Sequence, residues 1–148
     1  MPSFSSLTLS EESKNEYLDE IIEDEAYLTK TVGKIAFCSS SLKEYSINKK
    51  KLVEKMNVYA YIGLTDSYLT IASLSSLNIT VANGQFKIPL SDLSSIEISK
   101  KSFSYIITAH LKDGNIQLSL PIVSIGTNIK NQRQNVEQLV LHLRTNLS

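Results

Sequence analysis

The sequence predicts one domain of mainly β structure with some α: a curved antiparallel barrel of about seven strands. A C-terminal helix closes the barrel, and an acidic N-terminal helix precedes it. Two observations predict this class: short apolar segments with strand-like alternation from Gly33 onward, and one amphipathic segment after them. An antiparallel sheet of this size must bury one face, either by curling into a barrel or by stacking as two sheets, and a lone terminal helix can close an open end.

Residues 1–30 differ in character from the rest, so we divide the chain into this segment and a domain over residues 31–148. The segment holds eight acidic residues and two lysines, a charge of −6, whereas the remainder has a charge of +6. Thr8 and Glu11 match a capping box, and apolar residues at helical spacing predict a helix over about residues 10–28. The first interpretation is a solvated amphipathic helix packed on its own domain. The alternative is a docking contact on its own domain or on a neighbouring subunit, and of these two contacts we favour the neighbouring subunit. The apolar residues expected to make the contact are Leu18, Ile21, Ile22 and Leu28.

Two hairpins are predicted by their turn residues. Asn83-Gly84 suits a two-residue type I′ turn, because both central residues need positive φ, and Asp113-Gly114 has the same character. In both hairpins the apolar residues then share one face, so the turn chemistry and the core pattern support one register. The expected facing residues are Val81 with Phe86 at the first turn and Leu111 with Ile116 at the second.

Further strands are predicted around these hairpins by short segments rich in Tyr, Ile and Leu. Thr65-Asp66-Ser67 reads as the turn between two of them. Pro89 removes a donor from the hydrogen-bond ladder, so its strand ends there or lies at a sheet edge. The expected ranges are residues 34–45, 58–64, 68–74 and 94–99.

The last predicted element is a helix over about residues 128–146. Its apolar residues follow helical spacing and form one face, which is typical of a helix that packs against a core. These residues are Val136, Leu139, Val140, Leu143 and Leu147.

Two stretches carry a resemblance to a known family. Residues 61–71 (YIGLTDSYLTI) read as an apolar strand, a Thr-Asp turn and the next strand, and residues 86–96 (FKIPLSDLSSI) as a strand, an acidic turn and a strand. Over about residues 33–148 this order resembles the pleckstrin-homology-like superfold, in particular its small bacterial members. The chain departs from that pattern in having no Trp and in placing Tyr68 where bacterial members often have Arg or Lys. The resemblance implies a pleckstrin-homology-like barrel that recognises protein partners or itself and forms homo-oligomers.

Residues that could perform catalysis or bind metal are few. His110 and His142 are the only histidines and Cys38 is the only thiol; we expect the histidines at the surface and the thiol as a small buried side chain. The sequence has no Gly-rich phosphate loop, paired-carboxylate motif or zinc-ligand spacing. We therefore expect no catalytic residue, metal or cofactor. A small-ligand carrier or an enzyme with its pocket in the barrel remains an alternative that no residue set supports.

Two clusters of lysines are candidates for binding an anion or an anionic lipid. The cluster around Lys50 can also be interpreted as an ordinary solvated loop. Peripheral binding to an anionic membrane, at about 1 kcal/mol per base near the surface, is thus the alternative function. A formal net charge of zero argues against a nucleic-acid binder. The chain has no apolar run of membrane-span length and no leader pattern, so we expect a cytoplasmic protein. The clusters are Lys49, Lys50, Lys51 and Lys55, and Lys100 and Lys101.

Overall fold

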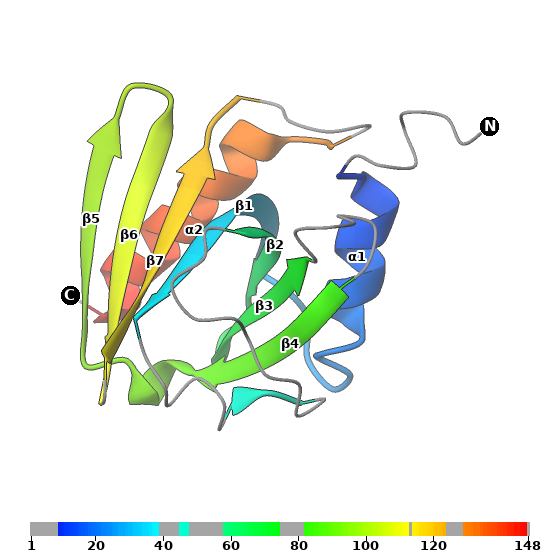
Figure 1. Cartoon of the computed structure of the whole chain (residues 1–148), viewed down its shortest axis with the longest axis horizontal. Helices are drawn as coiled ribbons and strands as arrows, with labels where there is room; N and C mark the ends of the chain where they lie inside the picture. The colour runs from blue at the N-terminus through cyan, green and yellow to red at the C-terminus, as the bar shows by residue number, and fades with distance from the viewer. Residues whose placement is uncertain are drawn as a thin grey trace.

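The computed structural model describes residues 9–38, 45–47, 58–74, 82–112, 114–123 and 129–147. Over these residues the chain forms two α-helices, seven strands and a short 3-10 helix (Figure 1). The elements are α1 (Glu11–Asp19), β1 (Thr29–Cys38), β2 (Val58–Leu64), β3 (Tyr68–Leu74), β4 (Ala82–Pro89), η3 (Leu90–Asp92), β5 (Ser95–Lys101), β6 (Ser104–Leu111), β7 (Gly114–Pro121) and α2 (Gln132–Leu147).

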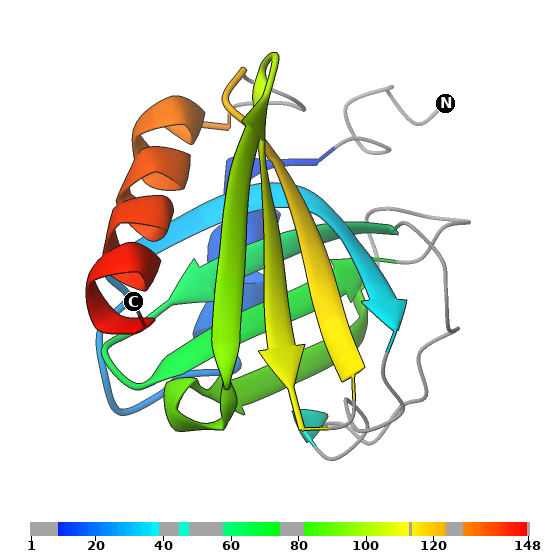
Figure 2. The same cartoon turned by 90° about the vertical axis from the view of Figure 1, so that its left-hand side faces the viewer.

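The strands form one antiparallel sheet in the order β4-β3-β2-β1-β7-β6-β5. β1 holds the sheet together: it pairs with β2 from Thr29 to Ile35 and with β7 from Lys34 to Cys38. The sheet bends along β1, so that β5, β6 and β7 run steeply across the more inclined β1 to β4 (Figure 2). The predicted fold class is confirmed, and the arrangement is consistent with a curved pleckstrin-homology-like barrel.

The interior of the barrel is filled with side chains. Its core takes residues from β1 to β4, β6 and β7, and Ile96 and Ile98 of β5 pack against its side. α2 completes the core with the apolar face that its sequence predicts, and Val136 and Leu139 on this face are completely buried. The helix therefore covers an opening of the barrel, as expected, although it begins at Gln132 rather than near residue 128.

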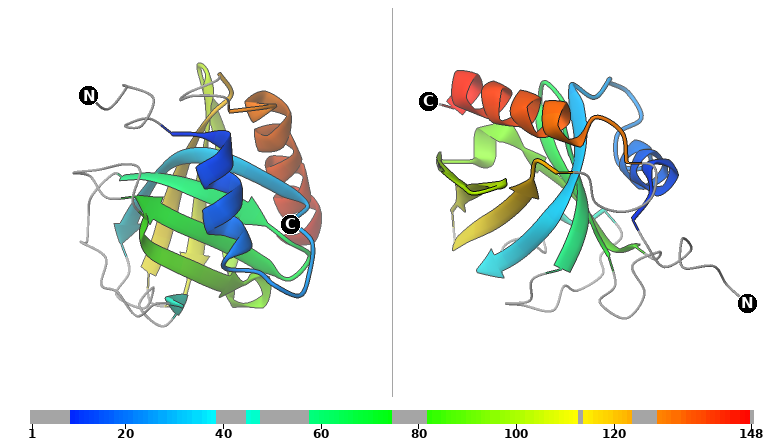
Figure 3. Two further views of the ribbon diagram at one scale, coloured as in Figure 1. Left: turned by 90° about the vertical axis from the view of Figure 1, so that its right-hand side faces the viewer. Right: turned by 90° about the horizontal axis from the view of Figure 1, so that it is seen from above.

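A second apolar cluster lies on the outer face of the sheet, where α1 crosses β1, β2 and β3 (Figure 3, left). Leu18, Ile21 and Ile22 are each at most 5% exposed, and they pack against this face together with Val32 and Tyr61. These three side chains therefore show the arrangement in which the helix packs on its own domain, and contact with a neighbouring subunit stays a prediction. Leu28 is 38% exposed.

The α1 helix is shorter than predicted. Ser10 caps its N-terminus by accepting a hydrogen bond from the Ser13 N–H at 3.1 Å, whereas Thr8 of the expected capping box lies outside the described residues. The helix ends at Asp19, and no basic residue lies in its last turn. Further acids follow at residues 23–25, and negative charge is unfavourable at a helix C-terminus, which explains the early stop.

The Asn83-Gly84 turn prediction is wrong. Both residues lie within β4, which pairs with β3, so that Phe86 faces Ile71 and Gly84 faces Ser73. Val81 lies outside the described residues. The register shifts between Ser73 and Leu74, which leaves an extra residue in β4, as in a β-bulge. The lack of a side chain at Gly84 serves packing, because a Cβ there would lie 2.8 Å from the Phe86 ring.

The second predicted hairpin exists with a shifted register. Leu111 pairs with Gly114 and Ala109 with Ile116, so the turn comes one residue earlier than expected and each pairing partner shifts by two residues. A shift of two residues keeps every side chain on its predicted face. The predicted strands at residues 58–64 and 68–74 are confirmed as β2 and β3, and Pro89 ends β4 at a sheet edge, as expected.

Candidate functional site

Of the two predicted lysine clusters, the structure describes only one. Lys49, Lys50, Lys51 and Lys55 lie outside the described residues. Lys100 and Lys101 end β5, where a two-residue turn of Ser102 and Phe103 leads into β6. This end of the hairpin projects beyond the rest of the barrel (Figure 2). The structure therefore places these two lysines on a protrusion.

The protrusion also exposes large apolar side chains. Phe103 is 67% exposed and Val123 is 49% exposed. The two lie close together, since the Ile122 N–H donates a hydrogen bond to the Phe103 carbonyl at 2.8 Å. We call Lys100, Lys101, Phe103 and Val123 the hairpin tip. Sequence reasoning missed both apolar members, and the available signal was an aromatic residue directly after a Lys-Lys-Ser run.

The backbone of the turn is strained. Ser102 has φ of 48°, a left-handed conformation that glycine adopts readily and other residues avoid. The turn is tight because Lys101 pairs directly with Ser104 across it. A two-residue hairpin turn of this kind requires positive φ at its first central residue, so the turn itself accounts for this conformation.

The hairpin tip carries uncompensated positive charge within the described part of the chain. No ion pair there involves Lys100 or Lys101, and the Lys100 ammonium lies 5.5 Å from the centre of the Tyr105 ring. The acidic residues of α1 lie on the other side of the barrel from β5 (Figure 1). The described surface is therefore polarised, with a basic tip and an acidic helix on opposite sides.

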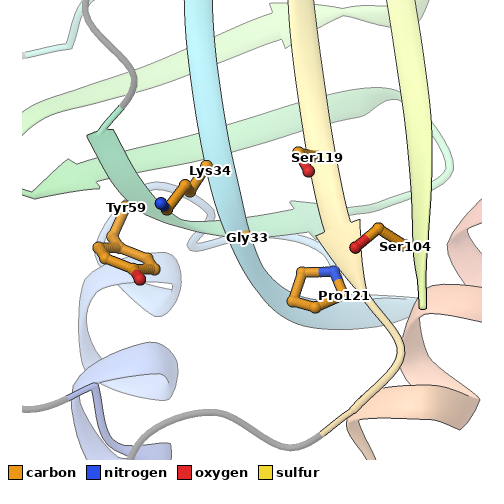
Figure 4. Close-up of a pocket in the computed structure, with 6 residues that line it drawn as sticks. All are labelled: Gly33, Lys34, Tyr59, Ser104, Ser119 and Pro121. Atoms are coloured by element: carbon orange, nitrogen blue, oxygen red, sulfur yellow. The ribbon is translucent and has the colours of Figure 1, made fainter. Parts of the chain in front are cut away.

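A shallow hollow of about 270 Å³ lies on the outer face next to the hairpin tip (Figure 4). Lys34 stands at its wall with its ammonium 4.8 Å from the centre of the Tyr59 ring. Gly33 lets β1 approach β7 closely beside this hollow, because a Cβ there would lie 2.6 Å from the Ser119 carbonyl oxygen. The lining residues are Gly33, Lys34, Tyr59, Ser104, Ser119 and Pro121, which include no nucleophile paired with a base.

A second hollow of about 300 Å³ lies where α1 approaches the start of α2. Its charges are used within the chain: the Glu11 carboxylate binds the Lys14 ammonium at 2.8 Å and accepts a hydrogen bond from the Lys130 N–H at 3.0 Å. Burial raises the pKa of Glu11, but the hydrogen bonds from Lys130 and Lys14 outweigh it and leave the pKa lowered. The Glu11 carboxylate therefore links α1 to the segment that leads into α2, and we call this contact the clasp.

The histidines show no catalytic arrangement in the described part of the chain. His110 Nε2 lies 2.7 Å from Glu97 Oε2 on the outer face of the β5–β6 hairpin, and both side chains are partly or largely exposed. His142 is half-buried on α2, and the side chain of Cys38 lies outside the description. The described residues contain no group of three side chains suited to a metal ion. None of the described helices has the length and apolar character needed to cross a membrane.

Fold and surface together define a filled β-barrel with a polarised exterior and a protruding apolar and basic tip. Comparisons with protein-family models, curated proteins and solved structures find no match for this chain. Membership of the pleckstrin-homology-like family therefore stays a prediction, and function is inferred from the chain's own residues.

Proposed function

We propose that this chain is a non-catalytic module that binds the surface of an anionic membrane through the hairpin tip. The observation that carries this proposal is the 67% exposure of Phe103 on a protruding turn, directly after Lys100 and Lys101. An aromatic ring enters the headgroup region of a bilayer while neighbouring lysines contact anionic lipids. The hairpin tip has both components on one projection.

The shape of the tip favours a bilayer as the partner. A protruding side chain needs a complementary pocket on a protein, whereas the interface of a bilayer accommodates it directly. The filled barrel interior gives no support to a carrier or enzyme with a pocket in the barrel. Self-association through the N-terminal helix receives less support, because Leu18, Ile21 and Ile22 pack on the chain's own sheet.

The charge distribution supports one orientation of the bound module. With the hairpin tip on the membrane, α1 lies across the barrel from β5, so its acidic residues are set apart from the lipid contact (Figure 1). Attraction at the tip therefore acts without the acidic residues of α1 beside it.

The expected binding is weak and reversible. Burial of the Phe103 side chain contributes about 1.5–3 kcal/mol, and the two lysines contribute about 1 kcal/mol each. The sum corresponds to a dissociation constant of about 0.2–3 mM of accessible lipid before ordering costs. Stable attachment would need a second contact, as it does for singly lipidated proteins.

Vesicle binding of the full chain tests the proposal. We expect cosedimentation with vesicles of phosphatidylcholine containing phosphatidylserine, weaker binding at high salt, and little binding to phosphatidylcholine alone. Phe103→Ala and the double change Lys100→Glu, Lys101→Glu should each reduce binding at least tenfold. Circular dichroism and melting temperature establish that each variant is folded.

Matched controls come from elsewhere on the surface. Leu141 is a similarly exposed apolar residue on α2, and Lys112 is an exposed lysine at the opposite end of β6. Leu141→Ala and Lys112→Glu should bind vesicles like the original chain. Equal losses in the control and tip variants, or binding that ignores lipid charge, would contradict the proposal. If the full chain binds no vesicles, the hairpin tip is left as a protein contact and membrane binding is wrong.

A further inference from the structure

We propose that Ser102 is a phosphorylation site and that its phosphate releases the hairpin tip from an anionic membrane. This inference rests on the proposed function. Ser102 lies between Lys101 and Phe103, at the centre of the surface that would contact the lipid. A charge added at this position acts on both parts of that surface, the lysines and the aromatic ring.

The position of Ser102 suits an incoming kinase. The residue is exposed, and its hairpin projects beyond the barrel (Figure 2), so a kinase can reach the hydroxyl without unfolding the sheet. Within the described part of the chain its hydroxyl has no hydrogen-bond partner to lose. Lys100 and Lys101 directly precede it, and a charge pattern next to the acceptor serine is one means by which kinases select substrates.

The backbone conformation of the two-residue turn places Ser102 at the apex of the hairpin. Its φ of 48° favours glycine, and glycine would make the same turn without strain. A serine at this position keeps a hydroxyl at the apex of the hairpin despite that strain. The hydroxyl makes no contribution to the described core, so a phosphate can be added there without loss of core packing.

The reaction is an ordinary phosphoryl transfer from ATP by a protein kinase. The Ser102 Oγ forms a bond to the γ-phosphorus, the bond between that phosphorus and the bridging oxygen of ADP breaks, and the hydroxyl proton passes to the catalytic carboxylate of the kinase. The product carries a charge of about −1.5 to −2 at pH 7.

The charge of the phosphate is about equal in size and opposite in sign to the summed charge of Lys100 and Lys101. Each lysine near an anionic surface strengthens binding about fivefold, so cancelling both weakens it about 30-fold. Repulsion between the phosphate and the lipid adds to the loss, as does the cost of bringing a dianion beside the inserted ring. The phosphorylated tip should therefore detach from vesicles that hold the unmodified chain.

The test compares full chains carrying phosphoserine at one genetically encoded position. Phosphoserine at Ser102 is expected to lower affinity for phosphatidylserine-containing vesicles at least 30-fold. Phosphoserine at Ser95, an exposed residue at the other end of β5, adds the same charge away from the tip and should change affinity less than threefold. Ser102→Asn, a neutral residue that accepts a left-handed backbone, should bind like the original chain.

A second measurement tests access to the hydroxyl. The folded chain is incubated with ATP and a serine kinase that prefers basic residues before its acceptor, and peptide mass spectrometry is expected to place the phosphate on Ser102. Modification elsewhere, or none, would overturn the assignment. If the unmodified chain binds vesicles and the Ser102 phosphoform binds equally well, the switch is wrong while membrane binding stands. If the unmodified chain binds no vesicles, the proposed function itself fails.

Discussion

Replacing Gln132 with leucine should strongly destabilise the fold, because the buried Gln132 amide completes the hydrogen bonding of β1 where β7 leaves it. Gln132 is 3% exposed. Its amide nitrogen donates to the carbonyls of Val32 and Pro121, at 2.8 Å each, and its oxygen accepts from the Val32 N–H at 3.3 Å. The same oxygen accepts a bond from the Thr31 hydroxyl at 3.1 Å. One side chain on α2 thus takes the place of a neighbouring strand.

Leucine fills a similar volume but leaves these backbone groups without partners. A buried donor or acceptor that loses its partner costs about 1–3 kcal/mol, and the Val32 N–H and carbonyl both lose theirs. We therefore expect Gln132→Leu to lower the free energy of unfolding by about 2–5 kcal/mol, a large part of the total for a domain of this size.

Urea unfolding followed by circular dichroism measures this loss. With a slope of about 2 kcal/mol per molar urea, the middle of the usual range, the midpoint should fall by about 1–2.5 M. Gln134→Leu is the matched control, because Gln134 is an exposed residue two positions further along the same helix, and its change should stay within about 0.5 kcal/mol. If Gln132→Leu also stays within this margin, the amide does not support β1 and our reasoning is wrong.

Three further predictions concern the outer face and the clasp of α1. Gly63→Ala should destabilise by about 1–3 kcal/mol, because the added Cβ would overlap the Tyr27 ring; thermal melting measures the change. Burial raises the pKa of Tyr27 to about 12, so the stability supplied by its neutral phenol, complete below pH 10, should be lost as pH rises from 10 through 12. Urea titrations of Tyr27→Phe should lack that part of the loss. Because the pKa of Glu11 is lowered in the fold, its carboxylate adds stability above the unfolded-state pKa, and this stability is lost as pH falls. The Glu11→Gln variant should therefore be less stable than the original chain at pH 7 and should lose less stability on acidification.

Each of these predictions has an outcome that would contradict it. An unchanged melting temperature for Gly63→Ala would mean that the Tyr27 ring moves aside without loss. Parallel alkaline unfolding curves for the original chain and Tyr27→Phe would assign the pH dependence to other groups. An equal acid response in Glu11→Gln would show that the clasp with Lys130 does not depend on the carboxylate charge.

The sequence predicted those elements whose signal is local. β2, β3 and the apolar face of α2 follow from alternation or helical spacing, because a residue that must face the core repeats at the period of its element. The Asn83-Gly84 prediction failed because two physical causes favour glycine. A turn needs its positive φ, whereas here a neighbouring ring needs the space, and only the pairing with β3 distinguishes them.

The candidate site was predictable in part for a similar reason. Lys100 and Lys101 are visible as a pair of charges in the sequence. The role of Phe103 depends on the position of the turn, and the predicted strand stopped at residue 99, whereas β5 continues to Lys101. Exposure of an aromatic ring is a property of the complete fold, since the same residue one position later would point elsewhere on the hairpin.

The position of β1 between β2 and β7 has a consequence for the order of folding. Lys34 must pair with Ser119, which lies far along the chain. Closing the barrel therefore requires two segments with a large sequence separation to meet, which carries an entropic cost. β2, β3 and β4 can assemble on β1 during synthesis, while its second edge waits for β7 and for Gln132 on α2. We expect closure to be the slow kinetic step, with β1 open to wrong partners until the last segment of the chain is available.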